Sequence, residues 1–227
     1  MKRSFVLAAF SILYLIGHSQ TLKFVIFSGG SELSSLAYMT NQRIIIKISQ
    51  DGNVQEWGNE QEAGRFYSEP WRLQPYMGRI EYFEKQFDSI LNGKIRSIGV
   101  TSITYYGSTE NAALVGKVKS IGNIFFNYYL DLENESLRGK IKTAGQKNLS
   151  YYTSFDNEAY RGKIKSIGGT QVSYYSTFDD VSIRGKLKSL GSHNFTWYTS
   201  LDRQGYQGGL KSGPRYPVIE GATYVIL

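Results

Sequence analysis

A pattern of alternating polar and apolar side chains recurs every 23 residues along most of this chain. Counting each copy from its first glycine as position 1, positions 2 and 4 are basic, position 3 is aliphatic and position 7 is glycine. A second alternating run covers positions 11 to 17, and position 18 is acidic. The copies begin at Gly93, Gly116, Gly139, Gly162, Gly185 and Gly208. Alternation with period two is typical of β-strands, so each copy predicts one β-hairpin.

The constant period predicts that the hairpins stack side by side as one array. Five copies occupy residues 93–207, and residues 208–227 hold a partial copy and a C-terminal strand. The stretch 78–88 resembles a shortened copy that could cap the array. Two strands in 23 residues leave no room for a crossover helix, which predicts an antiparallel meander. The sequence thus predicts an all-β fold: a strongly curled, trough-like or barrel-like meander, partly covered by a non-repeat, β-containing N-terminal region.

The second strand of each copy predicts one apolar and one polar face. The expected apolar face holds positions 11, 13 and 17, with these side chains: Ile103, Tyr105, Phe126, Tyr128, Leu132, Leu149, Tyr151, Phe155, Val172, Tyr174, Phe178, Phe195, Trp197 and Leu201. The polar face holds Ser or Thr, a tyrosine at position 14 and, we expect, both lysines of each copy. Position 13 should therefore be more buried than position 14. Turns are expected near Gly99, Gly122, Gly145, Gly168 and Gly191.

The N-terminal region, residues 20–92, does not share the repeat. Residues 22–27 read as a strand, and Asp51-Gly52 between two alternating runs predicts a hairpin over residues 43–57. Residues 31–39 could form one or two helical turns, and residues 58–75 read as a loop.

Residues 1–19 are typical of a signal peptide, with a basic start, an apolar stretch from Phe5 to Ile16 and small residues before Gln20. The alternative to a signal peptide is that this stretch forms a strand or helix of the core. Cleavage there would lower the formal charge from +7 to +5 by removing Lys2 and Arg3. The expected location is bacterial and exported: periplasmic, cell-surface or secreted.

Two rows of residues are candidate binding groups. The tyrosines could stack on successive sugar rings of a glycan, and the lysines could bind an anionic polymer. The alternatives are that the lysines pair with the position-18 acids on a solvated face, and that lysines and tyrosines pack on each other. The candidate residues are Tyr106, Tyr129, Tyr152, Tyr175, Tyr198, Lys117, Lys119, Lys140, Lys142, Lys163, Lys165, Lys186 and Lys188.

Catalytic chemistry has little support in the sequence. The chain has no cysteine, which excludes disulfides and thiolate chemistry, and after signal cleavage His193 would be its one histidine. The position-18 carboxylates recur identically, whereas a glycosidase needs two carboxylates in different environments. No nucleotide-binding or metal-binding motif is present, so we expect no cofactor, no metal and no nucleic-acid partner. Aromatic residues at 15% exclude a disordered chain.

The strings RGKIKSIG at residues 161–168 and YYSTFD at residues 174–179 resemble exported bacterial repeat proteins built on such units. The resemblance covers about residues 78–213 and implies a β-repeat architecture and export, without an activity. More distantly, the unit is similar to MORN repeats, which share the period, and to YD (Rhs-type) repeats, which share an aromatic-Asp pair before a glycine. The expected function is a non-enzymatic, exported binding or scaffold protein that contacts polysaccharide through its Lys/Tyr face. The alternatives are a polysaccharide hydrolase and a purely structural repeat protein without a ligand.

Overall fold

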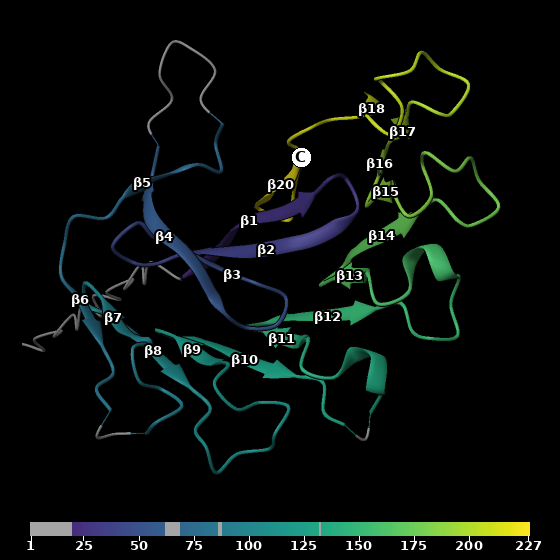
Figure 1. Ribbon diagram of the computed structural model, residues 1–227. Helices are drawn as coiled ribbons and strands as arrows, with labels where there is room; N and C mark the ends of the chain where they lie inside the picture. The colour runs from purple at the N-terminus through teal and green to yellow at the C-terminus, as the bar shows by residue number, and fades with distance from the viewer. Residues whose placement is uncertain (1–19, 62–68, 86–87, 132) are drawn as a thin grey trace, which may run out of the picture.

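The computed structural model describes residues 20–61, 69–85, 88–131 and 133–227. The fold is all-β, as predicted, and its strands form two large sheets and one small one (Figure 1). The predicted signal peptide, residues 1–19, lies outside the described residues. No helix within the described ranges is long and apolar enough to cross a membrane.

The N-terminal sheet has seven strands in the order β19-β20-β1-β2-β3-β4-β5. Its strands are β1 (Thr21–Ser28), β2 (Glu32–Met39), β3 (Ile44–Ile48), β4 (Val54–Glu60), β5 (Leu73–Pro75), β19 (Val218–Ile219) and β20 (Ala222–Ile226). The last strand of the chain, β20, pairs in parallel with the first, β1, while the other neighbours pair antiparallel. The two ends of the described chain therefore meet in one sheet.

The repeat sheet has eleven strands, which follow one another in chain order from β6 to β16. They are β6 (Ile80–Tyr82), β7 (Ile95–Ile98), β8 (Thr101–Tyr105), β9 (Val118–Ile121), β10 (Ile124–Tyr128), β11 (Ile141–Ala144), β12 (Lys147–Tyr151), β13 (Ile164–Ile167), β14 (Thr170–Tyr174), β15 (Leu187–Leu190) and β16 (His193–Asn194). A separate pair, β17 (Thr196–Trp197) and β18 (Leu210–Ser212), continues the array. The predicted meander is therefore confirmed.

Each predicted turn glycine opens a two-residue turn between the two strands of one hairpin. In the first copy, for example, Ile98 pairs with Thr101 across Gly99 and Val100. Gly99 has a φ of 58°, and its equivalents in the next four copies have φ between 52° and 59°. Only glycine adopts such angles without strain, which explains its presence at position 7 in every copy. Longer loops join each hairpin to the next, and two of them contain short 3₁₀ turns, η1 (Glu135–Leu137) and η2 (Glu158–Tyr160).

A β-bulge interrupts the pairing between consecutive hairpins at the same place in each copy. Between β8 and β9, Thr104 faces Ser120 but Tyr105 faces Val118, so Lys119 is an extra residue. The same shift recurs between β10 and β11, β12 and β13, and β14 and β15. A bulge changes the direction in which neighbouring side chains point. The two lysines of one copy therefore do not have to share a face.

The N-terminal sheet covers the apolar face of the repeat sheet, and one continuous hydrophobic core contains side chains from both. Core residues include Phe27 and Leu36 from the first sheet and Phe126, Val172 and Leu190 from the second. The expectation of a strongly curled, trough-like or barrel-like meander is wrong, because both large sheets end in open edges. Burial by a second sheet removes the physical need for the repeats to curl onto themselves.

The N-terminal region contains more strand than the sequence predicts. The strand over residues 22–27 and the hairpin over residues 43–57 are confirmed as β1 and as β3–β4. The expected helical turns over residues 31–39 are wrong, because this stretch is β2, which pairs on both sides and is largely buried. Tertiary pairing overrides the local preference here. The expected loop over residues 58–75 is partly strand, and its residues 62–68 lie outside the described ranges.

Four of the five aromatic pairs follow the predicted order of burial, and the first pair, Tyr105 and Tyr106, does not. Tyr105, Tyr128, Tyr151, Tyr174 and Trp197 are all buried. Of the position-14 tyrosines, four are half-buried, and Tyr106 is as buried as its neighbour Tyr105, each being 9% exposed. The placement of position 17 on the apolar face is wrong for Phe155, Phe178 and Leu201, which are almost fully exposed, and Leu132 lies outside the described residues.

The reason for this error is local. In the third copy the backbone N–H of Thr153 already bonds to the Asp156 carboxylate, so a turn begins directly after Tyr152. Position 17 consequently lies at the tip of a loop and not on a strand.

Candidate functional site

The lysines and tyrosines of the repeats form two rows on opposite sides of the repeat sheet. The inner row faces the N-terminal sheet and pairs position 2 with position 13, whereas the outer row faces away and pairs position 14 with position 4 of the following copy. In both rows the lysine Nζ lies 5.1–5.7 Å from the ring centroid. This is the geometry of a cation–π contact.

The inner lysines are half-buried and bond to the turns of the N-terminal sheet or to the next copy. Lys117 donates to the Asp51 carbonyl at 2.7 Å, and Lys186 donates to the Gly29 carbonyl at 2.6 Å. Lys163 forms an ion pair with Glu32 at 2.6 Å, and Lys140 donates to the Gly162 carbonyl. The expectation that both lysines of a copy lie on the polar outer face is therefore wrong for Lys117, Lys140, Lys163 and Lys186. The bulge between hairpins explains the difference.

Burial shifts the pKa values of several side chains in the inner row. Loss of hydration lowers the pKa values of Lys117, Lys140 and Lys186 below the ordinary lysine value. Burial also raises the pKa values of Tyr128 and Tyr151, so both phenols stay protonated. The inner row is thus part of the contact between the two sheets and is not available to a polymer.

The outer row brings together nine of the predicted site residues. They are Tyr106, Tyr129, Tyr152, Tyr175, Tyr198, Lys119, Lys142, Lys165 and Lys188. Lys211 of the partial sixth copy completes the series, with its Nζ 5.2 Å from the Tyr198 ring. Four of the five outer lysines are exposed and Lys142 is half-buried, as are the tyrosines apart from Tyr106.

Four of the five outer tyrosines donate their hydroxyl to the backbone of the next copy. Tyr129 donates to the Leu149 carbonyl at 3.0 Å, and Tyr152 and Tyr175 donate to the equivalent carbonyls one copy later at 2.9 Å. Tyr106 does the same with Phe126. Partial burial raises the pKa values of Tyr129, Tyr152 and Tyr175, which keeps these donors protonated. The outer tyrosines therefore hold neighbouring hairpins together.

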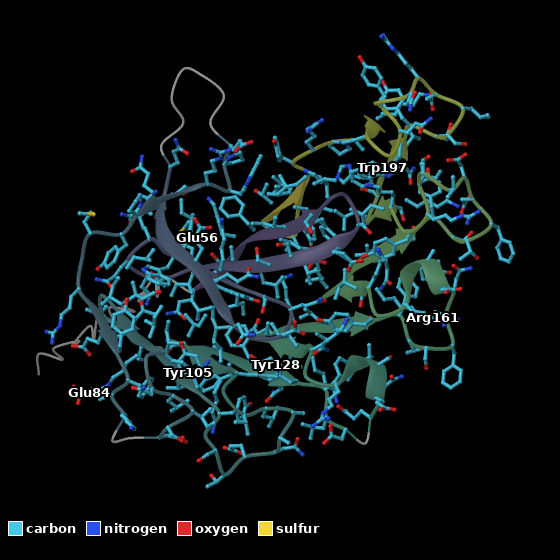
Figure 2. All side chains as sticks on the ribbon, in the orientation of Figure 1. Glu56, Glu84, Tyr105, Tyr128, Arg161 and Trp197 are labelled. Atoms are coloured by element: carbon cyan, nitrogen blue, oxygen red, sulfur yellow. The ribbon has the colours of Figure 1, made fainter. Side chains whose placement is uncertain are left out.

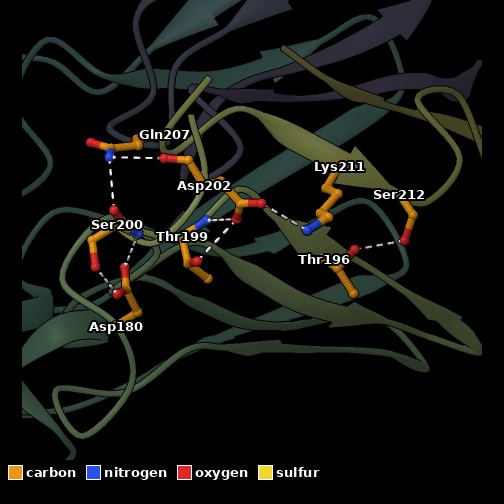
Figure 3. Close-up of polar contacts among 8 residues, drawn as sticks. All are labelled: Asp180, Thr196, Thr199, Ser200, Asp202, Gln207, Lys211 and Ser212. Atoms are coloured by element: carbon orange, nitrogen blue, oxygen red, sulfur yellow. Dashed lines mark hydrogen bonds and ion pairs between the residues drawn. The ribbon is translucent and has the colours of Figure 1, made fainter. Parts of the chain in front are cut away.

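The acids at position 18 complete the outer unit, as Figure 3 shows for the last copy. Asp202 accepts a hydrogen bond from the Thr199 backbone at 2.7 Å and forms an ion pair with Lys211 at 3.0 Å. Thr196 and Ser212 share a hydrogen bond of 2.7 Å between their hydroxyls. Equivalent acids recur in earlier copies, where Asp156 and Asp179 bond to Thr153 and Ser176.

These hydrogen bonds stabilise the ionised form of the carboxylates. The backbone N–H of Thr153 lowers the pKa of Asp156, and the hydroxyl and backbone N–H of Ser176 lower the pKa of Asp179. In the second copy the ion pair with Lys142 lowers the pKa of Glu133. Four of the position-18 acids, Glu133, Asp156, Asp179 and Asp202, accept the same hydrogen bond from the backbone N–H three residues earlier. This shared environment is unlike the divided environments of an acid–base pair.

Sequence reasoning missed a third periodic position. Position 19 of the first four copies, and Asp88 one period earlier, is Asp or Asn, whereas the fifth copy has Arg203: the row is Asp88, Asn111, Asn134, Asn157 and Asp180. Each side chain accepts a hydrogen bond from the backbone N–H two residues later. Three of them also bond to position 16 of the next copy, as in the 2.8 Å bond from Asn157 to Thr177. The sequence signal for this row is the recurrence of Asp or Asn every 23 residues in the loop that follows position 18, whose other residues vary from copy to copy.

Two glycines of the N-terminal sheet make equivalent contacts with inner aromatic rings, those of Tyr128 and Trp197. Val118 donates its backbone N–H to the Gly52 carbonyl at 2.9 Å, and its own carbonyl accepts the Tyr128 hydroxyl at 2.6 Å. In the last complete copy, Leu187 donates its backbone N–H to the Gly30 carbonyl at 2.8 Å, and its own carbonyl accepts the Trp197 indole N–H at 2.6 Å. The bulge supplies the backbone N–H groups for both contacts.

A hollow of about 460 Å³ lies where the N-terminal sheet meets the hairpin turns. Gln20 and Glu220 line it, and Glu220 forms an ion pair with Lys147 at 2.7 Å. His193 lies in β16 away from this hollow, and the described residues contain no cluster of three or more metal-binding side chains. None of the predicted site residues lines the hollow.

Comparison with known proteins gives no relative for this chain: no family model, curated protein or solved structure matches it.

Proposed function

We propose that the protein is an exported, non-enzymatic β-repeat scaffold. The observation that carries this proposal is the recurrence of one outer unit. In it, the tyrosine hydroxyl donates to a backbone carbonyl of the next copy and the tyrosine ring contacts a lysine of that copy. Groups that a binding or catalytic site would use are committed to holding the array together. Export is proposed from the sequence of residues 1–19.

The geometry favours a scaffold over a glycan-stacking surface. A lysine Nζ covers one face of each outer tyrosine ring at 5.2–5.7 Å, where a sugar would have to stack. The outer lysines lie among position-18 carboxylates, which reduces their attraction for a polyanion. The glycan-binding role of the Lys/Tyr face stays a prediction from the sequence.

The hydrolase alternative has less support. A hydrolase needs one carboxyl group with a raised pKa and a second that stays ionised. The pKa values of Glu133, Asp156, Asp179 and Asp202 are all shifted in the same direction, downward.

Retention on a panel of insoluble and acidic polysaccharides, at low and high salt, tests the proposal together with an assay for released sugars. A scaffold is expected to release no sugar and to bind no glycan through the outer face. Salt-sensitive retention that is lost when Lys119, Lys142, Lys165 and Lys188 become Gln would instead show a polyanion site. A control variant with the same change of charge neutralises four basic residues outside the five complete repeats: Lys23, Arg72, Arg79 and Arg215. Salt-resistant retention lost in a Tyr152→Ala/Tyr175→Ala variant would show stacking.

A further inference from the structure

Three bulky apolar side chains project from the tips of successive loops along one edge of the repeat array. Phe155, Phe178 and Leu201 occupy position 17 of the last three complete copies, and they are 96%, 94% and 95% exposed. The loops that carry them lie side by side along the array (Figure 1). Equivalent strands of neighbouring hairpins lie about 9.6 Å apart, so the three tips form a row of about 20 Å. A regular row of this kind is unlike the scattered apolar residues of ordinary surfaces.

The loops hold these tips in place. Within one loop, the Phe155 backbone N–H bonds to the Thr153 hydroxyl, while the Asp156 carboxylate accepts the Thr153 backbone N–H at 2.6 Å. Between loops, Asn157 exchanges two hydrogen bonds with Thr177, and Asp180 accepts the Ser200 backbone N–H at 2.9 Å. The tips therefore do not have to be ordered when they meet a partner, which lowers the entropic cost of binding.

An arginine accompanies each of the two phenylalanines. Arg161 donates its Nε–H to the carbonyl of Asp156, the residue after Phe155, at 3.0 Å, and Arg184 does the same with Asp179 at 3.0 Å. Both guanidinium groups are exposed, and neither forms an ion pair with another described residue. Figure 2 shows Arg161 beside its loop on the outer edge. Guanidinium groups suit phosphate, to which they can donate two parallel hydrogen bonds.

We propose that this loop edge inserts into the interface of a phospholipid bilayer. Phe155, Phe178 and Leu201 would enter the boundary of the acyl chains, and Arg161 and Arg184 would bind headgroup phosphates. Interfacial anchors have this arrangement, with apolar side chains in the lipid and cationic side chains at the headgroups. The surface is separate from the Lys/Tyr face, and the inference goes beyond the scaffold function.

A second copy of the chain fits this edge less well. Each aromatic side chain buries about 150–250 Å², so three separated tips fall short of the roughly 800 Å² per partner of a stable interface. A fluid bilayer accepts separate convex projections without a complementary surface. The three loops, residues 153–161, 176–184 and 199–207, carry five acidic and three basic side chains. Binding should therefore depend on insertion of the tips and not on attraction to anionic lipid.

Flotation with phosphatidylcholine vesicles tests the proposal. The chain beginning at Gln20 is used, because residues 1–19 are the predicted signal peptide and contain an apolar stretch that could itself bind lipid. We expect the triple variant Phe155→Ser, Phe178→Ser, Leu201→Ser to lower the vesicle partition coefficient by at least about tenfold. The matched control replaces Met77, Val100 and Phe125, which are 91%, 81% and 63% exposed away from the loop tips, with serine and should bind like the wild type. Arg161→Gln/Arg184→Gln should weaken binding less than the loss of the tips.

A labelling experiment locates the inserted residue independently. Because the chain has no cysteine, Phe178→Cys and Val100→Cys each accept one environment-sensitive fluorophore. Vesicles should raise and blue-shift the emission of the label at residue 178 and leave that at residue 100 unchanged. The proposal is overturned if the wild type does not bind, if the triple tip variant binds equally well, or if binding needs anionic lipid and is lost at about 0.5 M salt. Tip-dependent dimers in the absence of vesicles would assign the edge to self-association and also overturn it.

Discussion

Gly30 and Trp197 lie in such close contact that a methyl group on Gly30 would be 1.8 Å from Cη2 of the indole. The two residues are far apart in the chain, one in the turn between β1 and β2 and the other in β17. The contact, together with the bond from Leu187 to the Gly30 carbonyl, joins the N-terminal sheet to the last complete repeat.

Replacing Gly30 by alanine should therefore destabilise the protein far more than replacing Gly29. Both glycines have positive φ, 58° and 55°, so both variants carry the same backbone strain. A methyl group at Gly29 meets no atom within 4 Å. We expect Gly30→Ala to lower the free energy of unfolding by at least about 2 kcal/mol more than Gly29→Ala, measured by urea denaturation. Equal losses would contradict the packing of Trp197 against this turn.

Two buried tyrosines in equivalent positions should respond differently to loss of the hydroxyl. The Tyr128 hydroxyl bonds to the Val118 carbonyl at 2.6 Å, whereas the Tyr151 hydroxyl is buried without a partner among the described residues. We expect Tyr128→Phe to cost about 1 kcal/mol and Tyr151→Phe to be neutral or stabilising. Thermal and urea unfolding of both variants provide the measurement. A clear loss of stability in Tyr151→Phe would show that its hydroxyl has a partner, such as a buried water.

The link between neighbouring loops can be tested at Asn157. Alanine removes the bonds to Thr177 and to the Ala159 backbone, so we expect a loss of about 1 kcal/mol and faster hydrogen exchange at the Thr177 amide. Aspartate keeps the acceptor, and Asp180 occupies the same position one copy later. Asn157→Asp should therefore resemble the wild type. Equal exchange at Thr177 in all three proteins would mean that the loops are ordered independently of each other.

Stability should fall in acid because four position-18 carboxylates, those of Glu133, Asp156, Asp179 and Asp202, have lowered pKa values in the folded state. A carboxyl group of this kind stabilises the fold above the pKa of the unfolded chain, near pH 4, and loses its contribution as the pH falls through the folded pKa. Asp179→Asn removes one such group. The variant should be less stable than the wild type at pH 7, and the difference should shrink below about pH 4. Urea titrations from pH 7 to pH 2.5 give the comparison.

Glu158→Gln is the matched control, since this exposed carboxylate lies in the preceding loop and forms no ion pair with a described residue. A difference between Asp179→Asn and the wild type that does not change with pH would contradict an electrostatic origin.

Local signals predicted the repeat hairpins well. Glycine at position 7 marks a turn that needs positive φ, and the alternation around Tyr128 and Tyr151 gives the buried face. The prediction failed where the alternation was continued past the end of the strand, at Phe155 and Phe178. It also failed for Lys117, because no residue type in the sequence marks the bulge that turns this side chain inward.

The remaining errors come from contacts distant in sequence. Residues 32–39 look locally ambiguous and become a strand because β1 and β3 pair with them. The repeat sheet stays open because a second sheet covers its apolar face, and the 23-residue period does not reveal that second sheet. The outer Lys/Tyr row could be predicted as a face, whereas the use of the tyrosine hydroxyls by the next copy required the positions of the backbone carbonyls.

The two turns of the N-terminal sheet that contact Val118 and Leu187 have a consequence for how this molecule could evolve. Three repeat lengths separate these residues in the chain, and a single rigid sheet holds both of their partners, Gly52 and Gly30. An open solenoid can gain or lose units at little cost, because each unit meets its neighbours alone. In this protein the N-terminal sheet fixes the distance between its two turns. Duplication or deletion of one 23-residue unit between Val118 and Leu187 would therefore leave one of the two turns facing the wrong copy. The number of repeats within that interval is thus constrained by packing between the two sheets, as the size of a side chain in a core is constrained by its neighbours.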